Sequence, residues 1–166
     1  MSVQHCAQVL QNALQLSAED AKRLAHLSGG RVGTAMRYAQ DESQLDQYED
    51  ALAQLLDILP KSKRARLQYA ETLSKGKGNQ RQNSSFLLSV WLTFWRDILI
   101  THSQAELPLV NLRHESALKT LASQLKLSQI ESILKAHEKG LEQIDANVNP
   151  RLLIENILLN IPRLKV

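Results

Sequence analysis

Cysteine, aromatic residues and long apolar runs are all scarce in this chain of 166 residues. The single cysteine, Cys6, can form neither an internal disulfide nor a cysteine-rich metal cluster. The five histidines are scattered without a pair at ligand spacing, so we expect no metal and no cofactor. No apolar run reaches the roughly 18 residues that a bilayer span requires, and the N-terminal segment lacks a leader pattern. The sequence therefore predicts a soluble, cytoplasmic protein with no membrane partner.

Leucine and alanine are abundant, and apolar spacings of three and four recur along the chain without a competing strand pattern. These features predict an all-α protein of about nine helices. The expected helical segments are 3–14, 16–30, 32–41, 45–60, 61–75, 86–100, 115–125, 127–144 and 147–162. The polar stretch 76–85 (GKGNQRQNSS) is typical of a solvated loop. We expect two groups of helices, a three-helix unit to residue 41 and a larger bundle from residue 43.

Residues typical of helix ends support several of these boundaries. Ser128 and Glu131 stand in the register of a capping box at the start of the eighth segment. In the last segment Asn149 is an expected N-cap and Pro150 the first helical residue. Leu153 and Ile157 then fall on one face of that helix, which should pack inside the bundle.

The stretch 26–40 (HLSGGRVGTAMRYAQ) raises the question of a phosphate site, because glycines beside a basic residue precede a helix. A Walker loop needs a lysine followed by serine or threonine, and a dinucleotide fingerprint needs three spaced glycines after a strand. Both patterns are missing here. We therefore interpret Gly29 and Gly30 as the end of one helix rather than as a nucleotide site.

A cluster of cations lies in residues 61–82, where Glu71 is the one acid. Such a segment could follow a nucleic-acid backbone, and it could equally be a solvated protein surface. Tyr69 is the one aromatic residue among these cations, so base stacking has little support. The cations are Lys61, Lys63, Arg64, Arg66, Lys75, Lys77 and Arg81, of which the first four form the candidate basic surface.

The most apolar segment, 86–100 (FLLSVWLTFWRDILI), is the expected central helix of the larger bundle. Phe86, Trp91, Phe94 and Trp95 are its expected core aromatics. Arg96 and Asp97 follow directly and suggest a paired contact with a neighbouring helix. No nucleophile or positioned histidine lies near these two charges in the sequence, so we expect a structural rather than a catalytic role.

Together, three segments resemble the clamp-loader subunits of bacterial DNA polymerase III. Residues 24–40 (LAHLSGGRVGTAMRYAQ) look like the last helices of the lid in AAA+ clamp-loader ATPases. Residues 86–100 and 147–162 look like the C-terminal collar domain of the delta-prime subunit, or of the related delta subunit. The resemblance implies a lid remnant at 1–41, within which the chain begins, and a collar oligomerisation domain at 43–166.

In that family the lid carries a sensor-two arginine, and the resemblance puts Gly33 at its position beside Gly29, Gly30 and Arg31. Since glycine offers no charge to a phosphate, a subunit that does not hydrolyse ATP is implied. The implied role is a non-enzymatic scaffold in DNA replication that binds other clamp-loader subunits, of the gamma or tau and delta types, through collar contacts of segments 86–100 and 147–162. Contact with DNA would be indirect. The alternative is a small helical nucleic-acid-binding protein that uses segment 61–82.

Overall fold

The computed structural model describes residues 2–76 and 78–166 and, within them, an all-α protein, as the sequence predicts. Helix accounts for 77% of the structure, in nine α-helices and one short 3-10 helix of the described residues. None of these helices is both long and apolar enough to span a bilayer. The elements are α1 (Val3–Leu14), α2 (Ala18–Leu27), α3 (Val32–Gln40), α4 (Glu42–Ile58), α5 (Lys63–Ser74), α6 (Gln80–His102), η1 (Leu112–His114), α7 (Glu115–Gln124), α8 (Leu127–Asp145) and α9 (Pro150–Asn160).

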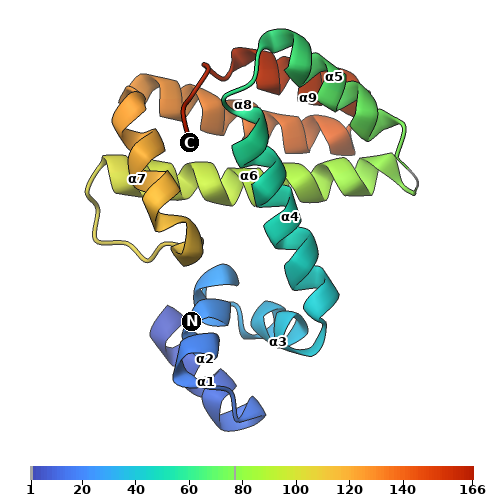
Figure 1. Ribbon diagram of the computed structural model, residues 1–166. Helices are drawn as coiled ribbons and strands as arrows, with labels where there is room; N and C mark the ends of the chain where they lie inside the picture. The colour runs from blue at the N-terminus through green and yellow to red at the C-terminus, as the bar shows by residue number, and fades with distance from the viewer. Residues whose placement is uncertain (1, 77) are drawn as a thin grey trace.

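The first three helices pack around a small core of their own (Figure 1). Cys6 and Leu10 of α1 meet Ala21 and Ala25 of α2 in this core, and all four are fully buried. Serine N-caps start the first two helices, because a serine oxygen accepts a backbone N–H that the first turn leaves unpaired. This unit lies below the rest of the molecule in Figure 1.

A larger bundle contains α4 to α9 around a second core. Helix α6 runs through its middle and packs against α4, α7, α8 and α9 (Figure 1). Helices α5 and α9 lie side by side at the far end, and α4 leads from the small unit into the bundle. The long α6 is central because ten of its residues are buried, on more than one side of the helix.

Charged and polar contacts connect the small unit to the bundle. Arg23 of α2 lies 3.7 Å from Glu49 of α4, and Glu49 also accepts a hydrogen bond from His114 Nε2 at 3.0 Å. This hydrogen bond, more than the nearby arginines, lowers the pKa of Glu49. His26 Nδ1 contacts the Leu109 carbonyl, so α2 touches both α4 and the segment between α6 and α7.

One sequence-based boundary and one expected cap are wrong. Residues 80–85 are helical rather than loop, because Asn79 caps α6 with hydrogen bonds from Arg81 N and Gln82 N and so starts the helix before its apolar part. Helix α8 begins at Leu127, where the Lys126 N–H donates to Gln129 Oε1 at 2.9 Å, and not at a box of Ser128 and Glu131. The segment starts at residue 127 as expected, but its N-cap is Lys126, two residues before the expected Ser128.

Candidate functional site

Arg66 is the most connected side chain of the basic segment, and it is buried with 2% of its surface exposed. Its Nη1 donates to the carbonyls of Leu158, at 2.8 Å, and Ile161. Its Nη2 donates to the carbonyls of Leu59, at 2.7 Å, and Pro162, at 3.0 Å. The prediction that Arg66 belongs to a basic surface is therefore wrong.

The local sequence explains why an arginine is needed at this place. Pro162 stands four residues after Leu158 and has no N–H to give to the Leu158 carbonyl. The guanidinium supplies the missing donor, and its positive charge interacts favourably with the negative end of the α9 dipole. Burial, and then repulsion by Arg163, lowers the pKa of Arg66.

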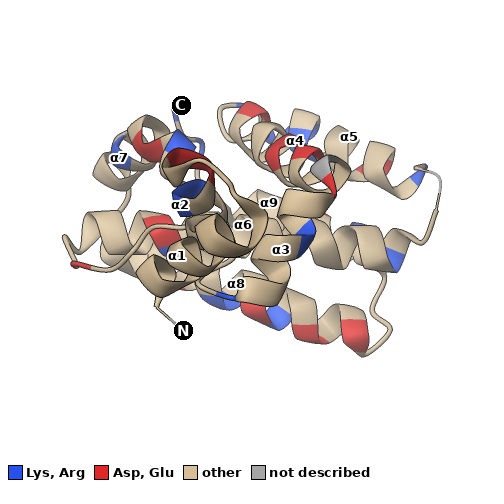
Figure 2. Cartoon of the chain, turned by 90° about the horizontal axis from the view of Figure 1, so that it is seen from below, with Lys and Arg blue, Asp and Glu red and all other residues tan. Residues whose placement is uncertain are grey.

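The remaining cations of segment 61–82 do not form one basic stripe among the described residues. Lys61 lies 3.4 Å from Asp57, an acid of α4 that precedes the segment. Lys75 donates to Glu71 at 2.7 Å, while Lys63 and Arg64 are exposed on the first turn of α5. Arg81 is exposed on the first turn of α6, and Lys77 lies outside the described residues. Over the molecule as a whole, basic and acidic residues are mixed on the ribbon seen from below (Figure 2).

Asp97 is fully buried and organises the segment before η1. Its carboxylate accepts hydrogen bonds from the backbone N–H groups of Val110, at 2.9 Å, and Asn111, at 2.7 Å, and from the Asn111 side chain. Arg96 lies 3.6 Å from Asp97 but is itself exposed. The prediction that these charges contact a neighbouring helix is therefore wrong. The carboxylate of Asp97 instead binds a connecting segment, because a buried carboxylate needs several N–H donors.

The two tryptophans of α6 lie beside a histidine for which the sequence alone predicted no role. Trp91, Phe94 and Trp95 are fully buried, and the rings of Trp91 and Trp95 each lie 6.3 Å from that of His137 on α8. Phe86, by contrast, is 39% exposed, so its expected place in the core is wrong. The position of His137 four residues after the buried Ile133 was the signal for burial.

The last helix has the predicted start. Asn149 accepts a hydrogen bond from Arg151 N, and Pro150 is the first residue of α9. Leu153 and Ile157 are buried in the core of the bundle itself. These two side chains are consequently not available to a neighbouring protein.

The glycine stretch forms a junction between α2 and α3. Gly29 and Gly30 have φ values of 60° and 77°, and the Gly30 N–H donates to the Ala25 carbonyl at 2.9 Å, which ends α2. Arg31 turns back and donates from Nε to the Ser28 carbonyl at 3.0 Å. Gly33 lies in the first turn of α3, and a Cβ added there would have no neighbouring atom within 4 Å among the described residues.

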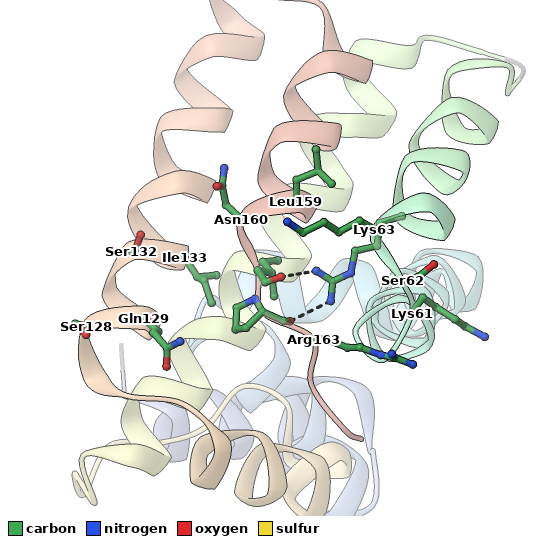
Figure 3. A pocket seen from close by; sticks show the side chains of 13 residues that line it. Lys61, Ser62, Lys63, Ser128, Gln129, Ser132, Ile133, Leu159, Asn160 and Arg163 are labelled. Atoms are coloured by element: carbon green, nitrogen blue, oxygen red, sulfur yellow. Dashed lines mark hydrogen bonds between the residues drawn. The ribbon is translucent and has the colours of Figure 1, made fainter.

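A polar pocket of about 450 Å³ opens where α5, α8 and α9 meet. Its lining combines side chains from three distant parts of the chain, which no single motif revealed. The described residues contain no group of three or more histidines, cysteines and acids able to hold a metal ion. The pocket can thus offer hydrogen bonds and positive charge to a ligand, with Lys63 and Gln129 on opposite sides (Figure 3).

Comparison with known proteins gives one family. The family model for the C-terminal region of the DNA polymerase III delta subunit matches residues 42–163, which begin with α4 and end just after α9. Neither a curated protein nor a solved structure matches the chain significantly. The match supports a role within the DNA polymerase III clamp loader, and it names delta where the resemblance had favoured delta-prime. Because the match covers most of the chain, the protein belongs to the family defined by the C-terminal domain of DNA polymerase III delta subunits.

Proposed function

We propose that this chain is part of a delta-type clamp-loader subunit whose task is to assemble with the other clamp-loader subunits rather than to perform chemistry. The observation that carries the proposal is the family match over residues 42–163. In this proposal residues 43–166 are the collar domain, and residues 1–41 are the remainder of a AAA+ lid. The separate small core of α1 to α3 supports that division.

The burial pattern directs attention to the outer surface for partner contacts. Trp91, Trp95 and Ile157 are used in the core of the chain itself, so an interface must draw on exposed side chains. Leu152 of α9 is 59% exposed and Leu67 of the adjacent α5 is 38% exposed. We therefore propose the outer faces of α5 and α9 as the surface that meets a neighbouring subunit of the gamma or tau type.

Co-purification of tagged chain with co-expressed clamp-loader subunits tests this role. Leu152→Glu should reduce the captured partner about tenfold or more, since it places a charge in an apolar contact. Leu107→Glu is the matched control, because Leu107 is 55% exposed in the segment between α6 and η1. If the parent chain captures none of these subunits, the proposed function is contradicted, whereas equal capture by parent and Leu152→Glu contradicts only the chosen surface.

A second arm addresses nucleic acid. Reversing Lys61 and Lys63 to glutamate, with the buried Arg66 and with Arg64 beside Leu67 left intact, should preserve partner capture with at most a modest loss. Sub-micromolar binding of primed DNA by the parent at about 150 mM salt, abolished in the double variant while capture is intact, would favour a nucleic-acid role.

A further inference from the structure

The pocket between α5, α8 and α9 is lined by cations on one side and by uncharged polar groups on the other. The cations Lys61, Lys63, Arg66 and Arg163 line it, and no aspartate or glutamate of the described residues does. Hydroxyl and amide groups come from the start of α8 and the end of α9. The other lining residues are Ser62, Ser128, Gln129, Ser132, Ile133, Leu159, Asn160, Ile161 and Pro162.

The cations of this pocket differ in how far they are already neutralised. Arg66 is bound to carbonyl groups, and Lys61 has Asp57 at 3.4 Å. Lys63 has no hydrogen bond or ion pair with another described residue, and its side chain extends toward Asn160 and Leu159 across the pocket (Figure 3). In the same view Lys61 and Arg163 point away, and Arg163 Nε donates to the Pro60 carbonyl, so Lys63 is the cation most available to a ligand.

Gln129 adds a donor on the opposite side. Its Oε1 accepts the Lys126 N–H at 2.9 Å, which leaves the amide NH₂ group free to donate to a ligand. The helix starts of α5 and α8 both contribute residues to the lining, and the positive ends of two helix dipoles add to the charge of Lys63. The outer part of the pocket therefore favours an anionic group.

A smaller cavity of about 170 Å³ continues from this pocket between α8 and α9. The two share Ser132, Ile133, Asn160 and Ile161, and the inner one reaches His137. His137 is fully buried, and its Nδ1 lies 2.8 Å from the Ile133 carbonyl, so Nδ1 carries the proton.

The other ring nitrogen of His137, Nε2, is buried and has no hydrogen-bond partner among the described residues. Burial lowers the pKa of His137 to about 4, and the neutral ring therefore offers Nε2 as an acceptor. Ala136 and Ile157 give the rest of this inner lining an apolar character. The apolar part of this lining is suited to an apolar side chain of a ligand, whereas Nε2 itself is enclosed by the protein.

We propose that this cleft, from Lys63 and Gln129 at its mouth to His137 at its floor, binds an acidic peptide segment of another protein. Its carboxylates meet Lys63 and the amide of Gln129, and an apolar side chain enters between α8 and α9. The inference goes beyond the proposed assembly role and does not depend on it, because the isolated chain already contains the whole cleft.

A peptide fits this cleft better than a nucleic acid does. No aromatic side chain of the described residues lines the pocket, so bases have no stacking partner. Lys63 is the available cation at the opening, and a single cation gives no track along which phosphates could lie. The apolar inner cavity would also be unused by a phosphate backbone.

Heteronuclear NMR titration of the full chain tests the proposal with a defined probe. The probe is an acetylated peptide of three glutamates and a C-terminal leucine with a free carboxylate, and its control replaces the glutamates by glutamines and amidates the terminus. The acidic peptide should produce saturable shifts of the backbone amides of Lys63, Gln129, Ser132 and Asn160 with a sub-millimolar Kd. The neutral peptide should not.

Lys63→Glu should weaken binding about tenfold or more, since it reverses the available cation. The variant should fold, because an acid at the first residue of α5 suits the helix dipole. Lys139→Glu changes the net charge equally on an exposed position of α8 outside the pocket, and should alter Kd less than about twofold.

Any of the following results would overturn the proposal. The first is the absence of saturable shifts at these amides at about 1 mM acidic peptide. The second is equal binding of the acidic and neutral peptides, or equal effects of the two lysine variants. The third is tighter binding of a short oligothymidylate than of the peptide at the same amides, which would assign the site to phosphate groups. Capture of clamp-loader subunits by Lys63→Glu is measured in parallel. It distinguishes a failure of the peptide site from a failure of the proposed assembly role.

Discussion

Replacing Arg66 by methionine should destabilise the protein strongly, although the sequence alone places this arginine on a solvated surface. The change removes a buried guanidinium that donates to four backbone carbonyls at the ends of α4 and α9. Methionine keeps much of the volume of the side chain but offers no donor. The carbonyls of Leu158, Ile161 and Pro162 then lose a donor, while that of Leu59 retains the Leu164 N–H at 3.2 Å.

The size of the effect follows from the number of acceptors left behind. An unsatisfied buried acceptor costs about 1–3 kcal/mol, and three of them set an upper range near 9 kcal/mol. Two effects reduce this loss. The variant no longer has to desolvate a buried charge, and water that enters the site can donate to some of the carbonyls. We therefore expect a net loss of about 3–5 kcal/mol in the free energy of unfolding, or roughly 10 °C in Tm for a domain of this length.

Thermal and urea unfolding followed by far-UV circular dichroism measure this loss. Arg64→Met is the matched control, because Arg64 is exposed two residues earlier on α5, and it should change stability by at most about 0.5 kcal/mol. Arg66→Lys should fall between the two, since one ammonium group cannot span all four carbonyls. If Arg66→Met and Arg64→Met melt at nearly the same temperature, the assignment of Arg66 as a structural residue is wrong.

Three further predictions concern stability, acid and nucleotide. Gly140→Ala should lower the free energy of unfolding by about 1–3 kcal/mol, because the new Cβ would lie 2.9 Å from Ile157 Cδ1. Gly33→Ala, at a position with open space around it, should instead stabilise α3 by up to about 1 kcal/mol. Urea unfolding of the two variants measures both effects. The hydrogen bond from His114 lowers the pKa of Glu49. The ionised Glu49 therefore stabilises the fold above the ordinary carboxylate pKa, and this stabilisation is lost as the pH falls through the lowered value. Glu49→Gln should flatten this part of the profile of stability against pH, and an unchanged profile would contradict the pairing. Magnesium ATP should give no binding heat in calorimetric titration, since the sequence has no Walker motif, and micromolar affinity would oppose the non-enzymatic role.

Local sequence rules predicted the helices well where a cap and an apolar face coincided. Asn149 and Pro150 mark the start of α9 correctly, and the glycines at 29 and 30 end α2 with positive φ. The rules failed at α6, where Asn79 starts a polar helical extension that has no apolar face to reveal it. A cap alone can thus begin a helix that hydrophobic periodicity does not detect.

The roles of Arg66, Asp97 and His137 could not be predicted from spacing, because their partners come from other parts of the fold. Arg66 binds carbonyls more than ninety residues later, and Asp97 holds two backbone N–H groups across a connecting segment. In sequence Arg66 looks like an ordinary surface charge, and Asp97 suggests a contact with a neighbouring helix rather than with a connecting segment. Their burial is a consequence of tertiary packing, which composition and periodicity do not encode residue by residue.

This separation of buried from exposed charges decides which substitutions can report on binding. A charge change at Arg66 or Asp97 removes hydrogen bonds from the core, so any loss of partner capture would first reflect unfolding. Lys63 and Leu152 are exposed, and their substitution can weaken a contact without removing internal bonds. Because Lys63 lines the pocket and Leu152 does not, a variant of each separates peptide binding from subunit assembly. Loss of both activities in either variant alone would mean that the pocket and the outer face of α5 and α9 belong to one continuous interface.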